Sequence, residues 1–174
     1  MSRLRTAGVL LVLLLVHITV FAHVRPLGVA PDVLILAAVI GGTVGGGDYG
    51  ARHGFVAGLL FDLMAPAAPF GLAAGVYGSV GYGAGLFARA VDSEDPRVVP
   101  ATAGLGSFVG IAGYGVGLGV LGAEQYVEWR LLWVALAASI YNVFLAVPVQ
   151  LMYRWVAAGE RPRARTETGR SVVN

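Results

Sequence analysis

Charged residues are scarce in this chain. Asp, Glu, Lys and Arg make up 13% of its 174 residues, against roughly a quarter in a typical soluble domain. Lysine is absent, so every basic residue other than histidine is an arginine. Such a composition argues against an ordinary soluble domain. With 57% hydrophobic residues and a mean hydropathy of +0.75, the sequence predicts an integral membrane protein.

Cysteine is also absent, which excludes disulfides, thiolate metal sites and cysteine nucleophiles. His17 and His23 are six residues apart and lie on different sides of a helix, so they do not form a metal-ligand pair. The chain has neither a P-loop nor a dinucleotide-binding fingerprint, and no Ser, His and carboxylate set at membrane depth. The sequence therefore predicts a non-enzymatic protein without catalytic, cofactor-binding or metal-ligating residues.

Six apolar segments follow one another between the charges and prolines. A spanning helix needs about 20 residues, so we expect an all-α bundle of about six transmembrane helices in one domain of residues 1–158. The predicted spans are about 7–24, 31–47, 51–65, 70–88, 100–122 and 131–152, and residues 159–174 form a basic tail that we expect to be disordered and cytoplasmic. Pro66 and Pro69 divide the third span from the fourth, because one helix over residues 53–88 would be about 54 Å long. Pro148 is expected to kink the sixth span.

The arginines are distributed unevenly around these segments. With a cytoplasmic N-terminus, ten arginines fall in inside segments, and only Arg25 and Arg130 fall outside. This asymmetry follows the positive-inside rule. It predicts a multi-pass protein of the bacterial inner membrane with both termini in the cytoplasm.

Gly54, Gly58 and Asp62 recur every four residues and share one face of the third span. Small residues at this spacing let a second helix approach closely. An intramembrane Asp costs about 2.5 to 3.5 kcal/mol on insertion scales, so a reason for keeping it is expected. Asp62 either contacts a ligand, proton or partner, or makes a structural hydrogen bond to a Tyr or to helix N–H groups beyond the Pro66–Pro69 turn. The structural role is the favoured interpretation.

Two further glycine stripes lie in the fourth and fifth spans. They comprise Gly71, Gly75, Gly78, Gly81 and Gly85, and then Gly106, Gly110, Gly113 and Gly117. Both predict tight helix contacts, and the alternative is that they line a narrow cavity.

Several short motifs occur in a characteristic order. Pro31-Asp32 opens the second span, Gly54-Phe55-Val56-Ala57-Gly58-Leu59-Leu60-Phe61-Asp62-Leu63 fills the third, Gly71 follows, and Tyr77-Gly78-Ser79-Val80-Gly81-Tyr82-Gly83-Ala84-Gly85 lies in the fourth. In these motifs the chain resembles the rod shape-determining protein MreD family. The residues that carry the resemblance are Pro31, Asp32, Gly54, Gly58, Asp62, Gly71, Tyr77, Gly81 and Tyr82. They are candidates for helix packing or partner docking.

The resemblance implies a non-enzymatic inner-membrane subunit of the bacterial cell-shape and peptidoglycan-elongation complex. Its implied partners are the bitopic protein MreC, the MreB filament, RodA with its penicillin-binding transpeptidase, and the lipid bilayer; no nucleic acid is implied. One hypothesis is that the single span of MreC docks on the face of Gly54 and Gly58.

The alternative is a substrate-binding subunit of an energy-coupling-factor vitamin transporter, a family expected to be similar in fold. Those subunits commonly carry small residues at four-residue spacing in the first span. Here the first span reads Leu10-Leu11-Val12-Leu13-Leu14-Leu15-Val16, without such a stripe. The chain also supplies few polar groups for a vitamin, so the shape-complex interpretation is favoured.

Overall fold

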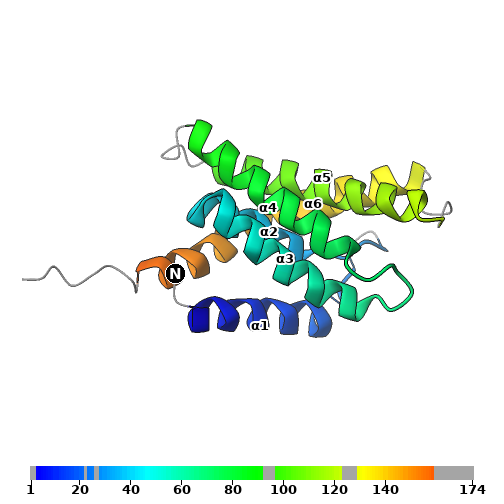
Figure 1. Ribbon diagram of the computed structural model, residues 1–174, viewed down its shortest axis with the longest axis horizontal. Coiled ribbons are helices and arrows are strands. Elements are labelled where there is room, and N and C mark those ends of the chain that lie inside the picture. The colour runs from blue at the N-terminus through cyan, green and yellow to red at the C-terminus, as the bar shows by residue number, and fades with distance from the viewer. Residues whose placement is uncertain (1–2, 22, 26–27, 92–96, 123–128, 159–174) are drawn as a thin grey trace, which may run out of the picture.

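The computed structural model describes residues 3–21, 23–25, 28–91, 97–122 and 129–158. Over these residues the protein is all-helical, with six helices and no strand, which confirms the predicted all-α class. The helices are α1 (Arg3–Thr19), α2 (Val33–Gly45), α3 (Gly47–Met64), α4 (Leu72–Ala90), α5 (Val98–Val120) and α6 (Trp129–Ala158) (Figure 1).

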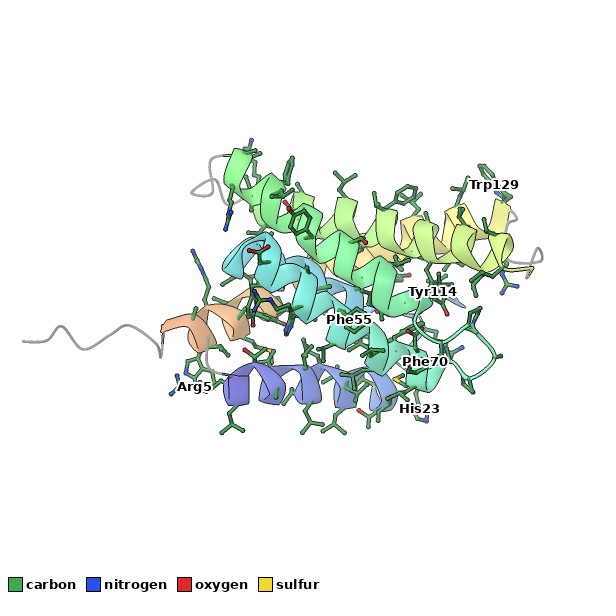
Figure 2. All side chains as sticks on the ribbon, in the orientation of Figure 1. Arg5, His23, Phe55, Phe70, Tyr114 and Trp129 are labelled. Carbon is green, nitrogen blue, oxygen red and sulfur yellow. The ribbon has the colours of Figure 1, made fainter. Side chains whose placement is uncertain are left out.

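Successive helices run in opposite directions along one common axis (Figure 1). The first turn of α1 therefore lies beside the last turns of α6, where the Arg5 guanidinium sits 5.6 Å from the centre of the Trp155 ring. We call this the arginine end of the bundle, because Arg5, Arg52, Arg89 and Arg154 lie in helix turns there and Arg97 immediately precedes α5. Figure 2 shows Arg5 at this end and His23 and Trp129 at the opposite one.

The second helix, α2, forms the centre of the bundle. Every residue from Val33 to Gly42 is buried, because α2 packs against each of the other five helices. Its sequence is apolar on all sides, which is the pattern of a helix surrounded by others. The remaining helices expose one apolar side each, for example Leu151 and Phe144 on α6.

Helix bounds differ from the predicted spans by a few residues. The first helix begins at Arg3 and ends at Thr19, before the expected end at residue 24. In its last turn the Thr19 hydroxyl donates a hydrogen bond to the carbonyl of Leu15 at 2.5 Å. The second and third helices meet at Gly46, whose positive φ of 84° allows a corner of one residue. The last helix continues through Pro148 to Ala158, so it is longer than expected. The predicted tail of residues 159–174 lies outside the described residues.

Two of the described helices are long and apolar enough to cross a bilayer. These are α5 with 23 residues and α6 with 30. Among the shorter helices, α1 and α2 are apolar over residues 4–19 and 33–45. The length and composition of these two helices thus indicate membrane association.

Candidate functional site

Asp62 caps the N-terminus of α4. Its carboxylate accepts hydrogen bonds from the backbone N–H groups of Gly71 at 3.0 Å, Ala73 at 3.1 Å and Ala74 at 3.1 Å. The N–H groups of the first helical turn have no partner inside the helix, and a carboxylate there also suits the helix dipole. The Pro66–Pro69 turn brings α3 and α4 together so that Asp62 reaches across. Asp62 therefore makes the structural hydrogen bonds that the sequence left as one of two interpretations.

Asp32 caps α2 in a similar way and hydrogen-bonds to two other helices, α4 and α6. Its Oδ1 accepts from the backbone N–H groups of Leu34 and Ile35, both at 3.1 Å, and its Oδ2 accepts from the hydroxyl of Tyr77 on α4. Asn142 on α6 donates to the Asp32 carbonyl at 2.9 Å and to Ser107 Oγ on α5 at 2.9 Å. Pro31 is buried immediately before this cap. We call these residues the Asp32 network.

Sequence reasoning selected Asp32 and Tyr77 but missed Asn142 and Ser107, which are fully buried. Asn142 could have been identified as an amide side chain in the middle of an apolar segment. Such side chains commonly hydrogen-bond between helices in membranes.

Gly54, Gly58 and Gly81 bring the backbones of α3 and α4 into contact. A Cβ atom on Gly54 would overlap the carbonyl oxygen of Tyr77, one on Gly58 that of Ala73, and one on Gly81 that of Gly50. Because α4 covers Gly54 and Gly58, a partner helix could not reach them unless α4 moved. These three candidates therefore serve helix packing within the chain, and the hypothesis of docking at Gly54 and Gly58 does not fit the structure.

The last two candidates, Gly71 and Tyr82, do not join this contact. Gly71 precedes α4 with a φ of 95° and has open space around it, so it serves the turn. Tyr82 is 44% exposed, and its ring covers Gly47 at the α2–α3 corner. The stripe on α4 is divided as well: Gly81 and Gly85 pack against backbone, whereas Gly75 faces open space.

The glycines of α5 pack against side chains instead of backbone. A Cβ on Gly106 would lie 2.7 Å from Val39 Cγ2, one on Gly117 2.8 Å from Leu72 Cδ1, and one on Gly113 3.8 Å from Val76 Cγ1. The prediction of close helix contacts holds for this stripe. These contacts are made to side chains, which can adjust more easily than the backbone atoms that face Gly54, Gly58 and Gly81.

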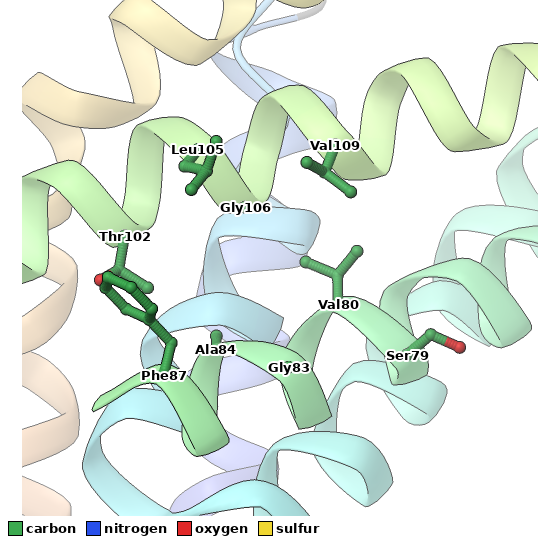
Figure 3. Close-up of a pocket in the computed structure, with 9 residues that line it drawn as sticks. All are labelled: Ser79, Val80, Gly83, Ala84, Phe87, Thr102, Leu105, Gly106 and Val109. Carbon is green, nitrogen blue, oxygen red and sulfur yellow. The ribbon is translucent and has the colours of Figure 1, made fainter. Parts of the chain in front are cut away.

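An outward groove lies between α4 and α5, with a volume of about 300 Å³. Figure 3 shows Gly83 and Ala84 of α4 opposite Gly106 of α5, with Phe87 toward one end and Val109 toward the other. The α5 rim of the groove is open, since Leu105 is 60% exposed and Val109 is 53% exposed. A Cβ on Gly83 would meet nothing within 4 Å. We call this feature the α4/α5 groove.

A second polar cluster lies at the arginine end. The His53 ring hydrogen-bonds through Nε2 to the hydroxyl of Tyr153 on α6 and stacks on Tyr49 at 5.4 Å. Tyr49 in turn hydrogen-bonds Thr6 of α1 at 3.0 Å. The sequence did not reveal this cluster, because His53 and Tyr153 are 100 residues apart. Within the described residues no group of three or more His, Cys, Asp or Glu side chains is placed to hold a metal ion.

No protein-family model, curated protein or solved structure matches this chain. The MreD resemblance therefore rests on the motifs alone.

Proposed function

We propose that this chain is a non-enzymatic, six-span subunit of the cell-shape and peptidoglycan-elongation complex in the bacterial inner membrane. It packs against the span of an MreC-like protein and links the wall-synthesis machinery, RodA and its transpeptidase, to the MreB cytoskeleton. The proposal rests on the motif resemblance together with an outward groove lined by small residues.

The outer surface of the bundle supports the membrane placement. Large aliphatic and aromatic side chains face outward on several helices, with Phe144 75% exposed and Val120 81% exposed. Such a surface is unfavourable in water and suits lipid. The five arginines of the arginine end then lie in the cytoplasm, together with both termini, as the positive-inside rule requires.

The α4/α5 groove is the proposed docking site for the partner span. Transmembrane helices associate through van der Waals packing where small residues let their backbones approach. Gly83 offers this approach, and Phe87, Leu105 and Val109 offer apolar walls. By contrast, Gly54 and Gly58 already hold α4.

The carboxylates support a scaffold role. Asp32 and Asp62 are each occupied by hydrogen bonds inside the fold. We therefore assign both to holding helix ends in place, which a rigid subunit needs in order to keep the two sides of the complex in register.

The test is co-purification of the tagged chain from native membranes in mild detergent, followed by mass spectrometry. We expect MreC-like and other wall-elongation proteins with the wild type and their loss with Gly83→Leu. Gly8→Leu is the matched control, because Gly8 on α1 also has open space around it. Recovery of a coupling subunit with paired ATPases would instead favour the vitamin-transporter alternative.

A further inference from the structure

A cavity of about 560 Å³ opens between α1 and α3 at the arginine end. Its polar lining consists of Thr6, Tyr49, Arg52 and His53, and its apolar lining consists of Ala7, Leu10 and Val56. The α4/α5 groove is on other helices, so this cavity is a separate feature.

Arg52 is the unusual member of the lining. It is exposed, and no hydrogen bond or ion pair joins it to any residue that the structure describes. The hydroxyls of Thr6 and Tyr49 are held beside it by their mutual hydrogen bond of 3.0 Å. His53 is 4% exposed and fixed by Tyr153. The cavity thus presents a guanidinium without an ion-pair partner among the described residues, beside ordered polar groups, which is the chemistry that recognises a phosphate.

Leu10 and Val56 lie farther from the arginine end along the helix axes than Thr6 and Arg52. Leu10 is one helical turn beyond Thr6 along α1, and Val56 is one turn beyond Arg52 along α3, or about 6 Å in each case. Both helices start at the arginine end, so Thr6 and Arg52 lie nearer that end, and Leu10 and Val56 lie nearer the middle of the bundle. Such a lining suits a ligand with an anionic head and a hydrocarbon tail.

We propose that this cavity binds an acidic phospholipid of the cytoplasmic leaflet. The lipid phosphate contacts Arg52 and the Thr6 and Tyr49 hydroxyls, and one acyl chain follows Ala7, Leu10 and Val56. Basic pockets between helices on the cytoplasmic side are suited to such headgroups. The inference rests on the membrane placement within the proposed function and is independent of any protein partner.

The test is native mass spectrometry of the full chain in detergent, titrated with phosphatidylglycerol and, in parallel, with phosphatidylcholine. We expect one tightly held phosphatidylglycerol, with an affinity lowered about tenfold in Arg52→Gln, since this removes a charge-assisted contact. Arg25→Gln is the matched control because Arg25 is exposed at the opposite end, and its affinity should equal that of the wild type.

A second variant tests the tail. Val56→Trp fills the apolar part and leaves Arg52 intact, so it should also weaken binding while the thermal midpoint of unfolding stays unchanged. Equal affinity of the wild type and both variants would overturn the proposal. Displacement of the lipid by glycerol phosphate at equal concentration would overturn it too, because the site would then recognise a soluble phosphate ester.

Discussion

The α3/α4 and α4/α5 interfaces are both rich in glycine, yet they are built differently. Between α3 and α4, a Cβ on Gly54, Gly58 or Gly81 would overlap a backbone carbonyl. Between α4 and α5, a Cβ on Gly117 would meet the end of the Leu72 side chain. Backbone atoms cannot move aside without shifting a helix, whereas a side chain can change its position. The same glycine spacing therefore produces a rigid contact in one place and an adaptable contact with an outward groove in the other.

The largest effect should come from Gly58→Leu. The new side chain would collide with the Ala73 carbonyl and the Ala74 Cα, and such overpacking costs about 3 kcal/mol or more. We expect loss of the cooperative thermal transition in detergent, while Gly8→Leu unfolds like the wild type. A wild-type midpoint for Gly58→Leu would show that α3 and α4 do not touch as described.

Asp62→Leu should be the next most damaging change, because it leaves three backbone N–H groups without an acceptor. We expect a loss of about 2 to 3 kcal/mol in the free energy of unfolding, and about 1 kcal/mol for Asp62→Asn, which keeps one acceptor oxygen. Chemical denaturation in detergent measures both values. Equal losses for the two variants would mean that the charge matters more than the acceptor.

Tyr77→Phe should cost about 1 to 2 kcal/mol, since it removes the donor to Asp32 from a buried site. The matched control is Tyr82→Phe on the same helix, which changes an exposed ring. In thermal unfolding, the midpoint of Tyr77→Phe should be lower than that of Tyr82→Phe. Identical midpoints would show that the hydrogen bond from Tyr77 to Asp32 does not stabilise the fold.

Gly117→Ala should have the smallest effect, within about 1 kcal/mol of the wild type. The added methyl group displaces Leu72 Cδ1 on α4, and alanine favours the helix over glycine by a similar amount. Gly81→Ala is its counterpart at the rigid interface and should cost clearly more in the same melting experiment. Reversal of this order would contradict the comparison of the two interfaces.

The sequence predicted the helices well because apolar runs and prolines mark them locally. It favoured structural hydrogen bonds over a ligand, proton or partner contact for Asp62, since the turn at Pro66 and Pro69 places helix N–H groups nearby. It could not distinguish Gly75 from Gly78, which lie in one stripe but face open space and Ala51 respectively. That difference depends on where the neighbouring helices lie. The partnership of His53 with Tyr153 was hidden for the same reason.

The central claim is that α4 offers one glycine face to its own bundle and another to a partner. The most direct test is co-purification of the MreC-like protein with a Gly83→Leu chain whose thermal midpoint equals that of the wild type. The account predicts that the partner is lost while the midpoint stays unchanged. Full recovery of the partner with this variant would contradict it.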